Sequence, residues 1–275
     1  MRSTYETVDI PVSIPIRKGV VDFHNHCTLD NKGAYGSSEN WLRVRSILGI
    51  RMVVSSITKG MGCPEVPLKQ KHDEALLIRE RAPDYFAIFG YVDMDNEGLD
   101  KIDWLKSNNF DGVKVHRHEY AYDDDRYMPY YEKISSWGVP ILFHTCHRER
   151  GKTAPYTLVR LCETFPEWTI IGAHFGSGYH EEADEVYHSY SNLYYDLSGS
   201  IVTRYGTDTF VRHLGRRADD WDRTVFGTDG RPETYATWVA AYEQLMDICG
   251  VSEPIREKVF FRNALQILGK DERDG

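Results

Sequence analysis

Short apolar runs of the β type alternate with helix-like stretches along nearly the whole chain. Eight such runs are present, and a helix-like stretch follows each one; they lie at 20–26, 51–58, 85–93, 110–116, 139–145, 169–175, 192–198 and 223–229. Strands that alternate with helices indicate a parallel sheet. Eight strand–helix units within 275 residues match the count and size of a (β/α)8 TIM barrel of the α/β class. An open doubly wound sheet is the alternative that the same alternation allows.

We expect one barrel domain over residues 1–275, with no internal repeat, low-complexity tract or linker. Residues 1–19 predict an extended N-terminal segment, and residues 252–275 predict a C-terminal helix and tail. Other helices are predicted at 39–48, 71–81, 99–107, 128–137, 155–164 and 233–249. The histidines within helix-like stretches are expected at the surface; they are His72, His188 and His213.

Residues that commonly bind metals lie at or near the carboxyl ends of five of these runs. The first run ends with His24 and His26, which share one face of a strand because side chains two residues apart point the same way. Two neutral imidazoles aimed at one point begin a divalent metal site. The later runs supply Lys114, His116, His144, His174 and Asp229. Because the carboxyl ends of parallel strands share one face, we expect these side chains to gather there.

Taken in order, these motifs resemble the amidohydrolase superfamily, and most closely its amidohydrolase-2 branch of hydrolases, lactonases and non-oxidative decarboxylases. The matching stretches are Asp-Phe-His-Asn-His (22–26), Gly-Val-Lys-Val-His (112–116), Leu-Phe-His-Thr (142–145), Gly-Ala-His-Phe-Gly (172–176) and Phe-Gly-Thr-Asp (226–229). Residues 262–269 also resemble the terminal helix of the branch. The resemblance therefore extends over residues 20–269 and implies a barrel enzyme that acts on small molecules.

By this resemblance, one divalent cation is held by His24, His26, His144 and Asp229, and His174 is a catalytic histidine or a ligand of a second metal. Imidazole and carboxylate ligands suit Zn²⁺ best, with Mn²⁺ and Fe²⁺ as alternatives. A metal with three imidazoles keeps a position open for water and lowers the pKa of that water towards roughly 7. Asp229 can then accept the proton of the water, while His174 polarises the substrate carbonyl.

Lys114 has two interpretations at this stage. In some members of the superfamily a lysine on the fourth strand is carboxylated and bridges two metals. The alternative is a lysine with a buried stem whose ammonium pairs with Asp229 or binds an anionic substrate. His116 lies on the same face, one step nearer the mouth of the barrel, and is expected to contact substrate rather than a metal.

Positive charge gathers in the loops after the strands, although the formal net charge of the chain is −9. Arg117, Arg148 and Arg231 follow the fourth, fifth and eighth runs. Guanidinium groups match carboxylates and phosphates well, so these residues predict a small anionic substrate, most simply a carboxylate. The alternative is that the loops are solvated and paired locally, for example Arg148 with Glu149.

The expected function is a metal-dependent hydrolase of a small, anionic amide, lactone or ester. A non-oxidative decarboxylase would use nearly the same residues, and a metal-independent lactonase would combine Asp229 and the histidines with arginines. A barrel that only binds a ligand is a further alternative, although it would have no need of this set of residues.

The composition narrows the expected partners and location. The negative net charge argues against binding of nucleic acid, and the absence of an apolar run of about 18 residues argues against a membrane span. Five scattered cysteines without a Cys-x-x-Cys pair, and no recognisable signal peptide, favour a cytoplasmic protein. The expected partners are a small carboxylate substrate and, because barrel enzymes are often dimers, a second copy of the chain.

Overall fold

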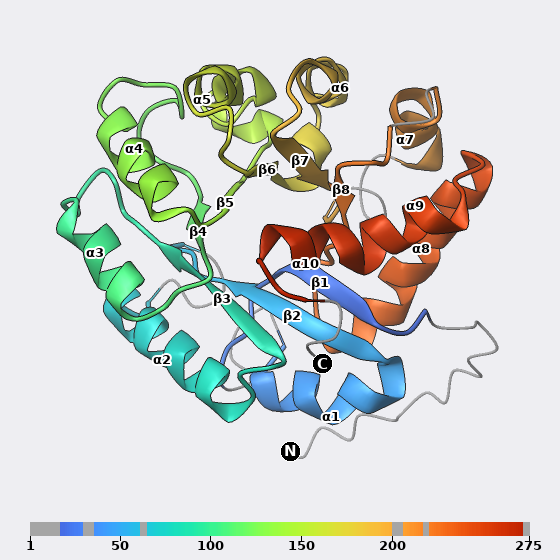
Figure 1. Cartoon of the computed structure of the whole chain (residues 1–275), viewed down its shortest axis with the longest axis horizontal. Helices are drawn as coiled ribbons and strands as arrows, with labels where there is room; N and C mark the ends of the chain where they lie inside the picture. Colours follow the sequence, from blue (N-terminus) through green and yellow to red (C-terminus); the bar gives the residue numbers. More distant parts are fainter. Residues whose placement is uncertain (1–16, 30–35, 61–64, 200–205, 217–219, 272–275) are drawn as a thin grey trace, which may run out of the picture.

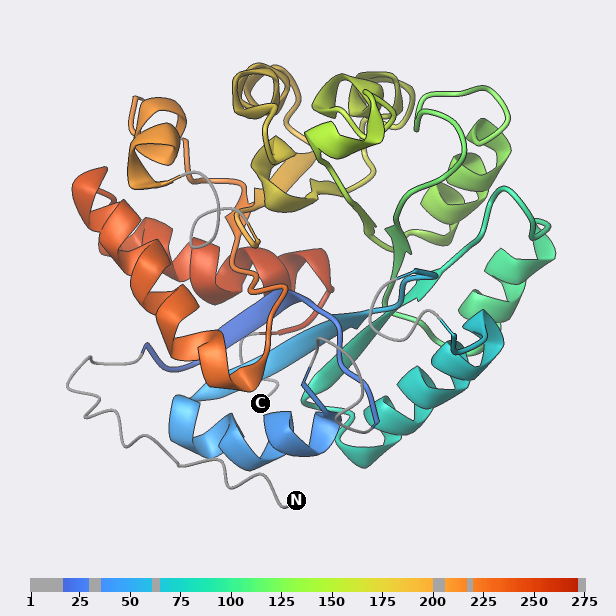
Figure 2. The same cartoon turned by 180° about the vertical axis from the view of Figure 1, so that it is seen from behind.

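The computed structural model describes residues 17–29, 36–60, 65–199, 206–216 and 220–271, which form a ring of strands surrounded by helices (Figures 1 and 2). All strand pairs are parallel, and the sheet order follows the sequence from β1 to β8. The strands are β1 Val20–Asn25, β2 Ile50–Ser56, β3 Phe86–Tyr91, β4 Gly112–Val115, β5 Ile141–Phe143, β6 Ile170–Gly172, β7 Leu193–Asp196 and β8 Thr224–Val225. The predicted order of eight parallel strands is confirmed.

Two backbone hydrogen bonds join β1 to the segment that follows β8. Phe23 N donates to Phe226 O at 2.9 Å, and Asp229 N donates to His24 O at 2.7 Å. They bring the first and last strands together, so the sheet forms a nearly closed barrel. The predicted TIM barrel is therefore confirmed, and the open doubly wound alternative is wrong.

The helices on the outside agree with the predicted ranges to within a few residues, apart from α6 and α7, for which the sequence predicted a helix after the strand but no bounds. They are α1 Ser38–Leu48, α2 Leu68–Arg81, α3 Asp100–Ser107, α4 Met128–Trp137, α5 Val159–Thr164, α6 His180–Ser189, α7 Gly206–Leu214 and α8 Tyr235–Ile248. Two predicted helices begin instead as 3-10 turns, Pro155–Leu158 before α5 and Pro232–Thr234 before α8. Each turn starts at a proline, whose missing N–H is tolerated in a first turn. No helix among these described segments is long and apolar enough to cross a membrane.

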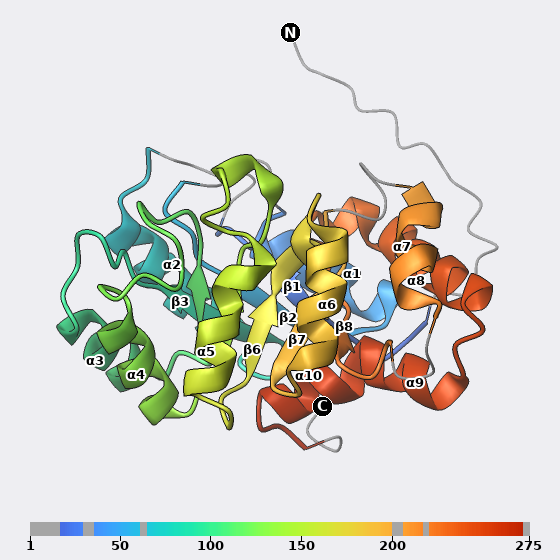
Figure 3. The ribbon, with the colours of Figure 1, turned by 90° about the horizontal axis from the view of Figure 1, so that it is seen from above.

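The predicted C-terminal helix is present as three consecutive segments: α9 Glu253–Glu257, a π-helical stretch Lys258–Arg262 and α10 Asn263–Ile267. Ala264 and Leu265 of α10 pack against apolar residues from inside the barrel, among them Val21 and Phe23. Figure 3 shows α9 and α10 along one end of the barrel, while the chain near residue 150 lies at the other. The C-terminal helices thus cover the end of the barrel opposite to the carboxyl ends of the strands.

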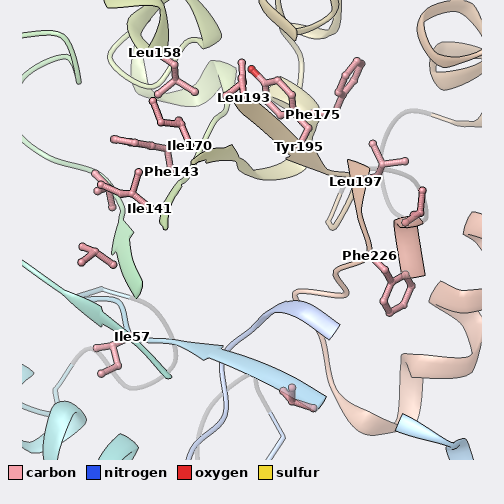
Figure 4. Packing of buried hydrophobic residues seen from close by; sticks show 14 of the residues in the cluster. Ile57, Ile141, Phe143, Leu158, Ile170, Phe175, Leu193, Tyr195, Leu197 and Phe226 are labelled. Carbon is pink, nitrogen blue, oxygen red and sulfur yellow. The ribbon is translucent and has the colours of Figure 1, made fainter. Parts of the chain in front are cut away.

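A second, larger apolar layer fills the space between strands and helices. It includes Phe143, Ile170, Tyr195 and Phe226, all of which Figure 4 shows. Residues on one face of each strand enter this layer, whereas residues on the other face enter the barrel. Lys114 illustrates the consequence, since its neighbours Val113 and Val115 belong to the outer layer and it points inwards.

Two of the histidines expected at the surface are buried. His72 and His213 are 0% and 7% exposed, and His188 is half-buried, so the surface prediction is wrong. The ring of His72 joins α2 to β3, because Nδ1 lies 2.9 Å from Leu68 O and Nε2 accepts the N–H of Tyr91 at 3.2 Å. Helical position alone did not reveal this bridging role.

Candidate functional site

His24 and His26 lie at the carboxyl end of β1, where the register of the β1–β2 pair shifts after Asp22. His26 Nδ1 lies 2.6 Å from the carbonyl oxygen of Ser56, and a carbonyl can only accept a hydrogen bond. Nδ1 of His26 therefore carries the proton, and Nε2 faces Asp229 Oδ1 at 3.3 Å. The centroids of the two rings lie 5.3 Å apart, so the rings are side by side, as the sequence spacing predicts.

His174 and Asp229 do not lie on strands, contrary to the prediction. β6 ends at Gly172 and β8 at Val225. His174 has a φ of 65° and Asp229 a φ of 48°, so both adopt the left-handed backbone that non-glycine residues seldom use. Apolar periodicity extends through both runs and cannot reveal such a turn. The backbone hydrogen bond from Asp229 N to His24 O, 2.7 Å long, holds the turn at Asp229 against β1.

The structure brings the predicted residues into one cluster. One ligand atom each from His24, His174 and Asp229 lies within 4.8 Å of the other two. His26 joins this group through its 3.3 Å contact with Asp229, and His144 joins it because its Nδ1 lies 3.1 Å from His174 Nε2. This three-residue group contains His174, which the resemblance implied as a catalytic histidine or as a ligand of a second metal.

A divalent cation fits this set of side chains. Imidazole nitrogens and a carboxylate are preferred zinc ligands. His144 Nε2 is buried and has no hydrogen-bond partner among the residues that the structure describes. A buried polar atom without a partner is costly, and a bound ion is one way to satisfy it. His24, His174 and Asp229 can thus supply two imidazoles and one carboxylate to a single ion.

Burial sets the protonation of these groups. It lowers the pKa of His24 to about 4, and it also lowers the pKa of His174 and holds that of His144 well below its usual range. Burial alone would raise the pKa of Asp229, but the contact with His26 and the neighbouring imidazoles hold that pKa well below its usual range. Neutral imidazoles and an ionised carboxylate are the forms that bind metals.

Lys114 and His116 both point into the same region. Lys114 is 1% exposed, and its Nζ lies 3.0 Å from His24 Nε2. Burial lowers the pKa of the Lys114 ammonium to about 8. The His116 ring lies 4.7 Å from that of His144, and burial lowers the pKa of His116 to about 2. Lys114 and His116 therefore each adjoin a candidate ligand, His24 and His144 respectively.

The three predicted substrate-binding arginines are exposed. Arg117 Nε lies 3.1 Å from Glu149 Oε1, so the local partner of Glu149 is Arg117 rather than Arg148. Arg148 follows β5 and Arg231 follows β8, on the loops at the same end of the barrel as the histidine cluster. All three arginines belong to the rim of the site and not to its buried centre.

Asp196, at the end of β7, was given no role from the sequence. It is fully buried, and its Oδ2 lies 2.8 Å from His24 Nδ1. Its Oδ1 accepts hydrogen bonds from the backbone N–H groups of His174 and Ser198 at 3.1 Å and 2.8 Å. The available signal was a carboxylate within the apolar run Leu-Tyr-Tyr-Asp-Leu.

A second group of possible ligands contains Asp93, Asp95 and His118. Its carboxylates are already engaged: Asp93 pairs with Lys59 and Asn96, and Asp95 accepts hydrogen bonds from Tyr127, the N–H of Glu119 and His118. This group has the contacts of a structural network, and we assign no metal to it.

Comparisons with known proteins place the chain in a family. The family model described as amidohydrolase matches residues 65–270, a range that begins after His24 and His26. A search of curated proteins finds no match.

Several solved structures share the fold. An uncharacterized TIM-barrel protein from Bordetella bronchiseptica has a TM-score of 0.72 at 18% identity, over 91% of this chain and 98% of that one. A probable 2-pyrone-4,6-dicarboxylic acid hydrolase from Acinetobacter baumannii has a TM-score of 0.65 at 13% identity, over 91% and 99%. A 2,6-dihydroxybenzoate decarboxylase from Rhizobium has a TM-score of 0.64 at 16% identity, over 92% and 99%. Since the family model matches most of the sequence, the chain belongs to the amidohydrolase family, in its amidohydrolase-2 branch.

Proposed function

We propose that this protein is a metal-dependent hydrolase of a small, anionic amide, lactone or ester. The observation that carries the proposal is the group of His24, His174 and Asp229, whose ligand atoms lie within 4.8 Å of one another. A divalent cation held there, most simply Zn²⁺, supplies Lewis acidity and lowers the pKa of water, which makes water a nucleophile near neutral pH.

Asp229 and His174 would have separate roles in the reaction. Asp229 is an ionised carboxylate at the edge of the cluster, 15% exposed, and so can accept the proton that the attacking water loses. His174 is held at Nδ1 by the carbonyl oxygen and the hydroxyl of Ser198, at 2.8 Å and 2.9 Å. Its Nε2 is thereby directed towards the cluster, where it can bind the ion or contact the substrate carbonyl.

The arginines of the rim support an anionic substrate. A carboxylate near the mouth of the site would meet Arg148 and Arg231, which follow β5 and β8. Arg148→Ala or Arg231→Ala should raise KM by tenfold or more for a carboxylate substrate and little for its neutral analogue, in line with a charge-assisted hydrogen bond of about 1.5–3 kcal/mol. Arg43→Ala, an exposed arginine on α1, is the control. Equal effects on both substrates would refute this role.

A decarboxylase is the second candidate. The observation in its favour is the buried Lys114 ammonium 3.0 Å from His24, because decarboxylation must end with protonation of carbon and an ammonium can donate that proton. The likeness in fold to a 2,6-dihydroxybenzoate decarboxylase is compatible with it.

One assay separates the two reactions. The purified protein, loaded with zinc or manganese, is incubated with small lactones, esters and amides that bear a carboxylate, and with hydroxybenzoates. Acid release from the first set without carbon dioxide supports hydrolysis. Carbon dioxide from the second set, lost in Lys114→Met, supports decarboxylation and overturns the hydrolase proposal.

A further inference from the structure

One buried carboxylate, that of Asp196, contacts the ring of His24 and the backbone N–H of His174, two of the three residues at the centre of the cluster. We infer that Asp196 is a positioning residue that holds His24 and His174 in the orientation needed to share one divalent cation. The inference rests on the metal centre of the proposed function and adds a residue outside the set of candidate ligands. Asp196 is 0% exposed, so each of its contacts is shielded from water.

The contact with His24 fixes which nitrogen carries the proton. Asp196 Oδ2 lies 2.8 Å from His24 Nδ1, and an ionised carboxylate can only accept a hydrogen bond. A neutral imidazole has one N–H, so the proton must lie on Nδ1 and the lone pair on Nε2. Nε2 is the atom that faces Lys114 Nζ at 3.0 Å, inside the barrel. A carboxylate on the far nitrogen also makes Nε2 more basic, as in carboxylate–histidine–zinc triads.

The other oxygen of the same carboxylate supports His174. Asp196 Oδ1 accepts the backbone N–H of His174 at 3.1 Å, at the residue whose φ is 65°. A left-handed backbone is unfavourable for a residue other than glycine and persists only where its surroundings enforce it. The hydrogen bond to Asp196 is one such constraint on the peptide that carries the ring.

Ser198 extends the support from the backbone of His174 to its ring. Asp196 Oδ1 accepts the N–H of Ser198 at 2.8 Å and also its hydroxyl. The carbonyl oxygen of Ser198 in turn lies 2.8 Å from His174 Nδ1. One carboxylate thus orients His24 directly and His174 through its own peptide and through Ser198, and both Nε2 atoms are directed into the cluster.

A purely structural role for Asp196 makes a different prediction, and Asp22 provides the comparison. Asp22 is also 0% exposed, but it accepts hydrogen bonds from Thr228, Asn25 and the backbone of His24, and contacts no imidazole ring among the residues described. Asp22→Asn and Asp196→Asn each replace a fully buried carboxyl group with an amide. If Asp196 only supports the fold, the two variants should lose stability and zinc affinity to similar extents.

The test measures zinc affinity rather than activity. Demetallated full-length protein and the two variants are titrated with Zn²⁺ in competition with a chromophoric chelator, and folding is checked by circular dichroism. We expect Asp196→Asn to weaken zinc binding by roughly 10- to 100-fold, the usual effect of losing a carboxylate behind a histidine ligand. Asp22→Asn should remain within about threefold of the wild type, well below that range.

The possible results separate the positioning role of Asp196 from the existence of the metal centre. Wild-type affinity in Asp196→Asn, or an equal loss in both variants, would overturn the positioning role while leaving the metal centre in place. Failure of the wild-type protein to bind zinc would overturn the proposed metal centre and this role together.

A second measurement covers the case in which Asp196→Asn does not fold. Nitrogen-15 NMR of the histidine rings in the wild-type apoprotein, with the His24 signals identified by their loss in His24→Asn, should show the proton on Nδ1. A proton on Nε2 would overturn the inference.

Discussion

Asp229 shows how much of a site can depend on the backbone of one residue. Its φ of 48° lies in the left-handed region, and its N–H donates to His24 O at 2.7 Å. The bond ties the loop after β8 to the same strand that carries His24 and His26. Because the carboxylate and the imidazoles are fixed to one another through the main chain, the spacing of the cluster does not depend on side-chain packing alone.

The first prediction concerns metal content. Asp229→Asn replaces an ionised ligand with a neutral amide, so we expect the protein to lose most of its zinc or manganese. The rate constant kcat should fall by at least about 100-fold, since both a ligand and a base are removed. Elemental analysis of the purified protein measures metal per chain, and Glu233→Gln, an exposed carboxylate in the same loop region, is the control.

The number of metal ions per chain distinguishes a mononuclear site from a binuclear one. One equivalent in the wild type that disappears in Asp229→Asn agrees with a mononuclear site. Two equivalents would favour Lys114 as a bridging ligand. No metal in protein produced with added zinc and manganese would contradict the prediction.

At the scale of single elements, β8 is shorter than its sequence pattern predicts. The apolar run at 223–229 predicted a strand up to Asp229, but β8 contains only Thr224 and Val225. Hydrophobic alternation shows that a segment is buried, whereas the left-handed turn at Asp229 depends on a hydrogen bond to β1, far away in the sequence. The pattern therefore predicted that Asp229 is a ligand-type residue but could not predict its backbone conformation.

His72 gives a second prediction, in which pH acts on the contact between α2 and β3. Burial lowers its pKa from the ordinary 6.5 to about 4. Between these values the unfolded chain binds a proton that the folded chain does not, so the stability that neutral His72 provides is complete above pH 6.5 and declines as the pH falls towards 4. The slope is at most about 1.4 kcal/mol per pH unit.

Denaturant unfolding across this pH range tests the prediction. His72→Leu leaves the N–H of Tyr91 without its partner and should cost roughly 1–3 kcal/mol at pH 7. The difference in the free energy of unfolding between wild type and His72→Leu should shrink as the pH is lowered. A difference that is constant from pH 7 to pH 4 would refute a neutral, buried His72.

The third prediction concerns the packing of β6 against β7. A Cβ atom at Gly172 would lie 2.1 Å from Cε1 of Tyr195, a buried ring of the outer apolar layer. Gly172→Ala should therefore lower the free energy of unfolding by about 1–3 kcal/mol, as overpacked cores do. Gly60→Ala, where no atom lies within 4 Å of the added methyl group, is the control. Thermal unfolding of the two variants measures the difference, and equal melting temperatures would contradict the packing.

At the scale of the whole molecule, the sequence predicted the barrel and the end at which the site lies. Both follow from counting alternating runs and from the rule that parallel strands end on a common face. The sequence did not predict Asp196, because this aspartate, unlike Asp229, belongs to none of the motifs that carry the family resemblance. Its importance comes from contacts with His24 and His174, which only the closed ring of strands brings together.

The same closure would make the binding of a metal ion by this cluster depend on the whole fold. His24, His174 and Asp229 belong to segments at the start, middle and end of the chain, so an ion that they share stabilises the folded barrel and not the unfolded chain. Zinc at 100 times its dissociation constant should add about 2.7 kcal/mol to the free energy of unfolding. For a protein of this size, that raises the melting temperature by about 5 °C.

Calorimetry of the demetallated protein, with and without zinc, tests this fourth prediction. A chelator should lower the melting temperature and zinc should restore it, whereas Asp229→Asn should respond to neither. A variant that is stabilised as much as the wild type would show that zinc binds elsewhere. Because the ligands come from distant parts of the sequence, a rise confined to the wild type would show that the ion stabilises the barrel through this cluster.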